Sequence, residues 1–126
     1  MVGPINRQLI MKKENHMMNF FYISIGAVPA AILRWKIEKI LIVNSLGCFI
    51  LGFIHALSIP KKYKLIFGFA FCGSMTTFSG WIFNLFEYLS NGFYIYFALD
   101  FVLTIGISFF AICFGNLLAR KIKILS

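Results

Sequence analysis

Acidic and charged residues are scarce in this chain. Of its 126 residues only 4 are Asp or Glu, and charged residues make up 13% of the sequence. A soluble domain typically carries about 25% charged residues. Hydrophobic residues reach 60% here, and the mean hydropathy is +0.87. This composition excludes a water-soluble globule and indicates a protein that lies within a lipid bilayer.

Groups of catalytic or metal-binding side chains are also missing from the sequence. Cys48, Cys72 and Cys113 lie in three different apolar segments without CxxC spacing, so we interpret them as small packing residues. His16 and His55 have no acidic or cysteine partner at ligand spacing. There is no nucleophile–base pair, phosphate-binding loop or cofactor fingerprint. The sequence therefore does not predict an enzyme.

Basic residues dominate the charge of the chain. Lys and Arg number 12, and the formal net charge is +8. They fall at the ends of apolar segments and not along one helical face, which is typical of membrane proteins and not of nucleic-acid-binding ones. Several Tyr and Trp residues also lie near segment ends, where interfacial anchors are expected. We expect membrane lipid as a partner, and no nucleic acid.

Four apolar segments divide the chain. Each is close to or longer than the roughly 20 residues that a membrane-spanning helix needs. Short connections link them, so consecutive helices should be antiparallel neighbours. The segments run from Asn19 to Leu33, from Ile40 to Ile59, from Leu65 to Ser90 and from Phe93 to Leu118.

The predicted fold class is an all-α membrane protein with four transmembrane helices. Residues 1–18 are a polar, basic N-terminal extension, interpreted as mobile, and residues 19–126 form one four-helix transmembrane domain. A chain of this size leaves little room for a pore within one subunit, so an oligomer is expected. Small residues at packing-compatible spacing, including Gly26, Gly52, Gly106 and Gly115, predict close helix contacts.

A polar stretch lies near the middle of the third segment. Gly73 to Gly80 holds two glycines and four hydroxyl residues within eight positions, and such residues disfavour a regular helix. Unpaired backbone groups at this depth are tolerated only where they are buried in protein or line a wet cavity. Two interpretations stay open: a broken helix that marks a site or pathway, or a continuous helix whose hydroxyls bond to its own carbonyls.

Two further polar residues interrupt apolar segments. Asn44 lies in the second segment, where its amide either links helices by hydrogen bonds or presents N–H donors to an anion. Asp100 lies in the fourth segment and is interpreted as a shallow, solvated acid near the membrane interface.

Three motifs occur in order along the chain. Residues 26–35 begin with Gly-Ala and end with Arg-Trp, residues 43–49 read VNSLGCF with Gly52 after them, and residues 71–79 read FCGSMTTFS. They are similar to the GA…RY/W, VNxxGSFxxG and FCGGxTTFS patterns of the CrcB/Fluc fluoride channels. The resemblance covers the chain from about Gly26 to the end of the fourth segment, and its third motif is highly specific.

The resemblance implies a fluoride-specific channel that exports fluoride passively and so lowers its cytoplasmic concentration and toxicity. It implies an antiparallel dimer of homologous subunits, with two fluoride pores and a broken third helix in each subunit. By matching position, the ion-conduction residues would be Asn44, Phe78, Ser79 and Trp81.

The same resemblance implies a structural sodium ion at the dimer centre that is held and not transported. Its ligands would be the backbone carbonyls of Gly73 and Thr76. Arg34, at the end of the first segment, is either a snorkelling anchor or, as the family suggests, a buried support near the pore mouth.

The chain departs from the family pattern at several positions of the third segment. Ser74 replaces the second glycine, Gly80 removes a hydroxyl from the expected polar track, and Trp81 replaces the second phenylalanine of a pair. Asn84 stands where the family commonly has an acidic residue. These departures put the geometry of the aromatic pair most in doubt.

Two alternative functions compete with the fluoride channel. A proton-coupled small multidrug transporter would need a carboxylate deep in the first segment, and residues 20–33 contain none. A non-conducting structural or assembly subunit of a paired channel stays open because of the departures in the third segment.

The basic residues also predict an orientation. Nine of the twelve lie on the side of both termini in the four-helix arrangement, and three lie opposite. The positive-inside rule therefore places both termini in the cytoplasm of a multi-pass protein of the bacterial plasma membrane. A chain with one strong orientation would rarely supply the inverted subunit of an antiparallel dimer. The predicted partner is thus an oppositely oriented paralogue in a heterodimer.

Overall fold

A computed structural model describes residues 3–125, and all regular elements within this range are helical. The first two residues of the predicted N-terminal extension lie outside the described residues. The elements are α1 (Pro4–Ile37), α2 (Ile40–Ala56), α3 (Lys61–Tyr63), the π-helix η1 (Lys64–Cys72), α4 (Gly73–Met75), α5 (Phe78–Ser90) and α6 (Tyr94–Leu125).

Within residues 3–125, three helical stretches are long and apolar enough to cross a membrane. They are Pro4–Ile37, Lys61–Ser90 and Tyr94–Leu125, while α2 is a shorter apolar helix of 17 residues. Large apolar side chains such as Phe69 and Phe110 are more than 70% exposed. Exposed apolar surface on this scale is expected where lipid or another subunit covers a protein.

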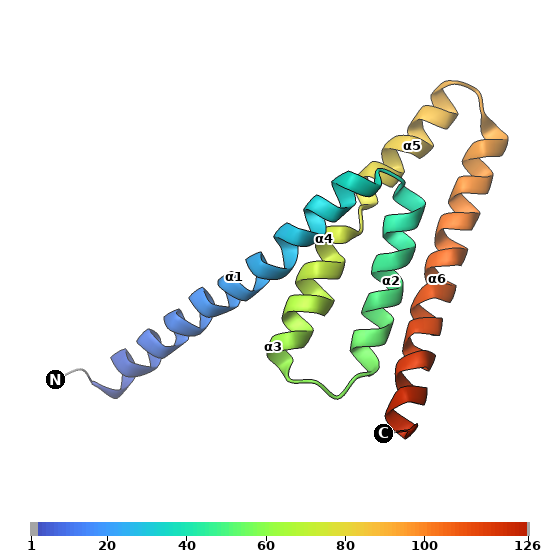
Figure 1. The fold of residues 1–126 in the computed structure, drawn as a ribbon. Helices are drawn as coiled ribbons and strands as arrows, with labels where there is room; N and C mark the ends of the chain where they lie inside the picture. Colours follow the sequence, from blue (N-terminus) through green and yellow to red (C-terminus); the bar gives the residue numbers. More distant parts are fainter. Residues whose placement is uncertain (1–2, 126) are drawn as a thin grey trace.

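The helices run back and forth between two ends of the molecule (Figure 1). The N-terminus, the connection between α2 and α3, and the C-terminus lie at the lower end of that view. At that end, Lys123 Nζ donates to Ser58 Oγ at 2.6 Å, which links α6 to the connection after α2. The two other connections lie toward the opposite end.

Glycines allow the helices to approach closely at three places. A Cβ atom at Gly26 would collide with the carbonyl oxygen of Ile66, and one at Gly52 with that of Ile112. A Cβ at Gly115 would collide with the carbonyl oxygen of Phe49. The predicted close helix contacts at Gly26, Gly52 and Gly115 are therefore confirmed, and the structure places them between α1 and η1 and between α2 and α6. Gly106 differs, because a Cβ there would meet nothing within 4 Å.

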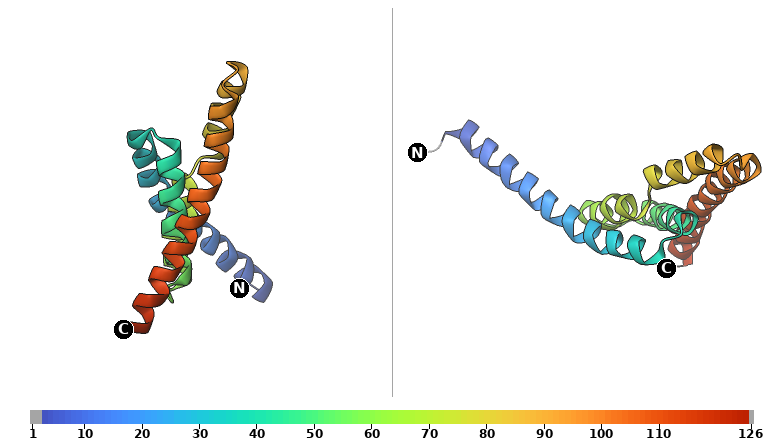
Figure 2. Two further views of the ribbon diagram at one scale, coloured as in Figure 1. Left: turned by 90° about the vertical axis from the view of Figure 1, so that its right-hand side faces the viewer. Right: turned by 90° about the horizontal axis from the view of Figure 1, so that it is seen from above.

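Helix α1 is longer at both ends than the first apolar segment. It begins at Pro4, where proline suits the first helical turn, and continues through the predicted extension without interruption. Lys62 Nζ lies 4.6 Å from the ring centroid of Tyr22, so Tyr22 is level with the beginning of α3. The part of α1 before Tyr22 projects away from the other helices (Figure 2).

The helical path through the third segment is interrupted at two residues. Thr76 (φ −75°, ψ 150°) and Thr77 (φ −138°, ψ 116°) have extended backbones. Gly73 to Met75 remain helical, so the stretch expected to disfavour a helix is wider than the interruption itself. Thr77 also caps α5, because its Oγ1 accepts a hydrogen bond from the Gly80 N–H at 3.2 Å.

Candidate functional site

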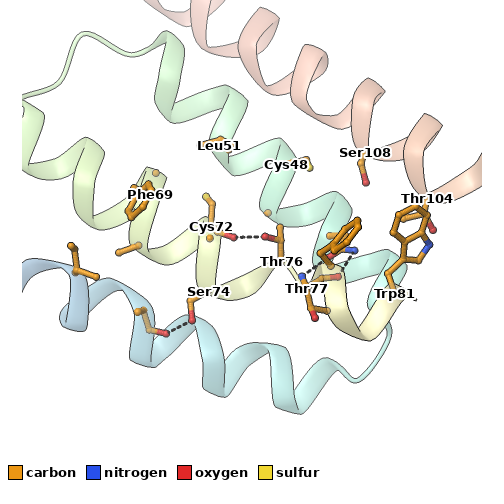
Figure 3. Close-up of a pocket in the computed structure, with 18 of the residues that line it drawn as sticks. Cys48, Leu51, Phe69, Cys72, Ser74, Thr76, Thr77, Trp81, Thr104 and Ser108 are labelled. Carbon is orange, nitrogen blue, oxygen red and sulfur yellow. Dashed lines mark hydrogen bonds between the residues drawn. The ribbon is translucent and has the colours of Figure 1, made fainter. Parts of the chain in front are cut away.

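A cavity lies where α1, α2, the interrupted segment and α6 come together. Its volume is about 690 Å³. Figure 3 shows polar groups from α2, α4, α5 and α6 around it, set among apolar side chains. The polar and aromatic residues of the lining are Asn44, Phe69, Ser74, Thr76, Thr77, Phe78, Trp81, Thr104 and Ser108.

The side chain of Asn44 bonds to the backbone of the interruption. Asn44 Oδ1 accepts from the Thr77 N–H at 2.7 Å, and Asn44 Nδ2 donates to the Thr77 carbonyl oxygen at 3.2 Å. The side-chain amide thereby supplies both partners that Thr77 lacks outside a helix. The helix-linking interpretation of Asn44 is confirmed. An amide nitrogen carries two hydrogens, so a second donor remains on Asn44 beyond this bond.

Helix α1 forms hydrogen bonds with Ser74, two residues before the interruption. Arg34 Nη1 donates to the Ser74 carbonyl oxygen at 3.0 Å, and Ser74 Oγ donates to the Ala27 carbonyl oxygen at 2.9 Å. Of the two interpretations of Arg34, the structure supports the one in which it is a partly buried support. Ser74 stands where the motif pattern has its second glycine, and its hydroxyl therefore has a hydrogen-bond acceptor, the Ala27 carbonyl oxygen.

The predicted sodium ligands lie at the interruption: Gly73 is in the last helical turn before it, and Thr76 is its first residue. The Thr77 N–H, which in a continuous helix would bond to the Gly73 carbonyl, donates to Asn44 instead. Gly73 is exposed, and a Cβ there would meet nothing within 4 Å. Backbone carbonyls of this kind suit a hard cation, which prefers oxygen ligands. Residues 3–125 contain no cluster of three or more His, Cys, Asp or Glu side chains that could hold a metal ion.

Two aromatic residues of α5 line the cavity, and one of them, Trp81, lies at the same end as Thr104 (Figure 3). The rings of Phe78 and Trp81 are 5.9 Å apart with an interplanar angle of 62°, and Trp81 stacks on Phe101 at 5.6 Å. Phe78 is 73% exposed, whereas Trp81 is only 8% exposed. Three of the four predicted conduction residues, Asn44, Phe78 and Trp81, thus line the same cavity; Ser79 is exposed and does not line it.

Helix α6 contributes polar residues that the sequence did not single out. Thr104 is buried, and its Oγ1 lies 3.3 Å from Asp100 Oδ1. Ser108 also lines the cavity. Asp100, Thr104 and Ser108 are spaced four residues apart in an apolar helix, and this spacing could have indicated a shared polar face.

Three buried polar atoms near this face have no hydrogen-bond partner among the described residues. They are Trp81 Nε1, Asp100 Oδ2 and Ser108 Oγ. Asp100 is only partly exposed and its Oδ2 is buried, which does not match a fully solvated acid; its shallow position near the membrane interface stays a prediction. The wall formed by α5 and α6 is therefore more polar than the sequence suggested.

Comparisons with known proteins give one consistent result. Residues 21–116 match the family model described as "CrcB-like protein, Camphor Resistance (CrcB)". The chain is 43% identical over 104 residues to "Fluoride-specific ion channel FluC 1" of Prochlorococcus marinus, covering 82% of this chain and 91% of that protein. It is 36% identical over 113 residues to "Fluoride-specific ion channel FluC 2" of a Synechococcus species, covering 85% of each. It is 33% identical over 115 residues to "Fluoride-specific ion channel FluC" of Methanocaldococcus jannaschii, covering 79% of this chain and 93% of that protein.

Proposed function

The chain belongs to the CrcB family of fluoride-specific ion channels, and from this premise we propose that it conducts fluoride passively out of the cell and so lowers cytoplasmic fluoride. The observation that carries this proposal is the cavity beside the interrupted segment. There Asn44, from the motif at residues 43–49, bonds to Thr77, from the motif at residues 71–79. The family consists of ion channels and not of enzymes, so no chemical step is assigned to these residues.

The cavity wall has the chemistry that a fluoride path needs. Fluoride is small and strongly hydrated, so a dry path has to replace its water with hydrogen-bond donors, and a fixed positive charge would hold it too tightly. The second Nδ2 hydrogen of Asn44 would be a neutral donor in this wall, and the hydroxyl of Ser79, an exposed residue of the same motif as Phe78 that does not line the cavity, would be another. The exposed ring of Phe78 can turn its electropositive edge toward an anion. Asn44, Phe78, Ser79 and Trp81 are therefore the proposed conduction residues.

A structural sodium ion would be held by the carbonyl oxygens of Gly73 and Thr76. Both residues lie where the helical hydrogen-bond pattern stops, and half-helix C-termini present negative partial charge. Gly73 is exposed without a close neighbour, which fits a second copy of this segment on the other side of the ion. When bound, sodium would supply a fixed positive charge between the two interrupted segments.

The proposed assembly is an antiparallel dimer in which each subunit contributes four transmembrane helices, the third of which is broken. Nine basic residues belong to the end that carries both termini, which the positive-inside rule assigns to the cytoplasm. This bias supports a heterodimer with an oppositely oriented paralogue in the bacterial plasma membrane. Comparable amounts of cytoplasmic and external C-terminal reporter, from the chain expressed alone, would exclude an obligate heterodimer.

Ion efflux from liposomes tests the proposed function. The protein is reconstituted alone and together with a candidate paralogue, and fluoride and chloride release are compared at equal concentrations. Rapid fluoride release with little chloride release is expected in at least one of the two preparations. Chloride release at a comparable rate would reject fluoride specificity, and no release from either preparation would favour the non-conducting subunit.

A further inference from the structure

The part of α1 before Tyr22 is exposed over its whole length. Every residue from Pro4 to Phe21 is exposed, and this α1 extension (residues 4–21) projects away from the other helices (Figure 2). Nearly all of it precedes residue 21, where the match to the CrcB family begins. The proposed fluoride path therefore gives the extension no role, and its own side chains have to indicate its partner.

Large apolar side chains share one face of the extension with a lysine. Residues three and four apart lie on the same side of a helix, and this spacing joins Ile10, Lys13, Met17 and Phe20. Phe20 is 74% exposed and Met17 is 67% exposed. A hollow in the surface is lined by the same face, with the residues Lys13, His16, Met17, Phe20 and Phe21. Apolar surface of this kind is unfavourable in water and indicates a contact with an apolar phase or partner.

The extension also carries a net positive charge. Arg7, Lys12 and Lys13 stand against one acidic residue, Glu14, and all four are exposed. A lysine can lay its apolar stem along an apolar surface while its ammonium group stays in a polar layer. Apolar and basic side chains on one exposed helix thus complement a surface that is negative outside and apolar beneath, as a leaflet of anionic phospholipid is.

The end of the bundle fixes the level at which the extension begins. Lys62 Nζ lies 4.6 Å from the ring centroid of Tyr22 and 5.9 Å from that of Tyr63. Lys and Tyr concentrate at the membrane–water interface, so we expect α1 to leave the hydrocarbon region near Tyr22. The extension continues for about 27 Å at the rise of an α-helix. The N-terminus nevertheless lies at about the level of the connection between α2 and α3, far to one side of it (Figure 1). The extension therefore runs outward along this interface.

We propose that the α1 extension lies in the headgroup layer at the end that carries both termini, and that it binds anionic phospholipids through Arg7, Lys12 and Lys13. A second copy of the extension is not the occupant of this surface. In the proposed antiparallel dimer, the partner's extension would lie at the opposite surface of the membrane. The inference goes beyond the fluoride channel, and its test does not depend on fluoride conduction.

Hydrogen exchange of the extension in nanodiscs, followed by mass spectrometry, tests the proposal. The whole chain is placed in discs of phosphatidylcholine alone or of phosphatidylcholine mixed with phosphatidylglycerol. An isolated helix of this length is only marginally stable in water, so the amides of residues 4–21 should exchange rapidly unless a surface holds the helix. Phosphatidylglycerol should slow their exchange about tenfold, because each basic residue near an anionic surface adds to the attraction. Sodium chloride at about 1 M should remove most of this effect, since it reduces the Debye length to about 3 Å.

Two matched double substitutions separate this charge recognition from a general effect of lipid. Lys12→Gln with Lys13→Gln leaves the extension one basic and one acidic residue, and should abolish most of the slowing. Lys36→Gln with Lys39→Gln removes the same charge from exposed positions at the opposite end of the bundle, and should leave the slowing in place. Neither pair lines the cavity, so fluoride efflux should be unchanged in both and reports that the variants are folded.

Three results would overturn the inference and leave the proposed function untouched. The first is equal exchange of residues 4–21 in the two kinds of nanodisc, measured on the unsubstituted chain. The second is slowing by phosphatidylglycerol that persists in the Lys12→Gln and Lys13→Gln protein, because the apolar face alone would then account for binding. The third is slowing by added RNA in phosphatidylcholine discs without slowing by phosphatidylglycerol, which would assign the basic residues to a different polyanion.

Discussion

Asn44→Ala is the substitution whose effect follows most directly from the structure. The change removes the acceptor for the Thr77 N–H at 2.7 Å and the donor to the Thr77 carbonyl at 3.2 Å. A buried backbone group left without a partner costs about 1–3 kcal/mol, whereas side-chain hydrogen bonds within membranes average only about 0.6 kcal/mol. Water can enter the neighbouring cavity and bond to one of the two groups. A loss of about 2 kcal/mol of unfolding free energy is therefore expected.

The assay is reversible unfolding in mixed micelles with increasing sodium dodecyl sulfate, run beside dimer yield and fluoride efflux. Asn91→Ala is the matched control, because Asn91 Nδ2 also donates to a backbone carbonyl, that of Glu87 at 2.9 Å, but at an exposed site. The control should change stability by less than about 0.5 kcal/mol. Asn44→Ala should still form dimers while its fluoride flux falls at least about tenfold, a barrier change of 1.4 kcal/mol. If Asn44→Ala is as stable as the control, the hydrogen bonds of Asn44 to Thr77 do not stabilise the fold. If dimer yield and fluoride flux fall together, Asn44 only links helices and is not part of the fluoride path.

Other expectations concern packing, the aromatic pair and the ion. Gly52→Ala should sharply reduce the yield of folded protein, because the Cβ of the new alanine would collide with the Ile112 carbonyl oxygen. The control Gly106→Ala should fold normally, because a Cβ there meets nothing within 4 Å. Equal yields of the two variants would show that α2 and α6 are not in close contact. Phe78→Ala should lower fluoride efflux with little change in dimer yield, since its ring is 73% exposed; unchanged efflux would remove Phe78 from the path. Replacing sodium with N-methylglucamine should weaken the dimer, measured by subunit exchange, and identical exchange rates would exclude a structural sodium ion.

The sequence predicted which parts of the chain meet at the cavity better than it predicted the local backbone. The motifs around Asn44 and Phe78 indicated a shared site, and the structure places both residues in the cavity wall. The interruption is narrower than the polar stretch that suggested it, because contacts from α1 hold Ser74 within a helical turn. Such tertiary hydrogen bonds cannot be inferred from helix propensities.

The π-helix η1 and the polar face of α6 were not predicted. Hydrophobic periodicity does not distinguish a π-helix from an α-helix over nine residues. The Sγ of Cys72 donates to the Phe67 carbonyl five residues earlier, a contact that only the folded backbone reveals. Thr104 and Ser108 were missed because a hydroxyl residue in an apolar helix is commonly a packing residue that bonds to its own backbone.

The length of α1 follows from a different cause. Hydropathy defined the first segment by where apolar residues stop, but a helix can continue into polar sequence as long as no residue breaks it. No proline or glycine occurs between Pro4 and Gly26, and the helix is continuous across this range. Composition therefore predicted where the first apolar segment begins, at Asn19, but not where helix α1 begins, at Pro4.

Fluoride efflux from liposomes with and without a potassium ionophore tests passive conduction most directly. Liposomes loaded with potassium fluoride carry this protein together with its paralogue, and a fluoride electrode records release into fluoride-free potassium-poor buffer. An anion that moves alone builds up a membrane potential, so release should be slight until valinomycin lets potassium follow, and then rapid. Rapid release without valinomycin would show that fluoride moves together with a compensating ion and would contradict a passive fluoride channel.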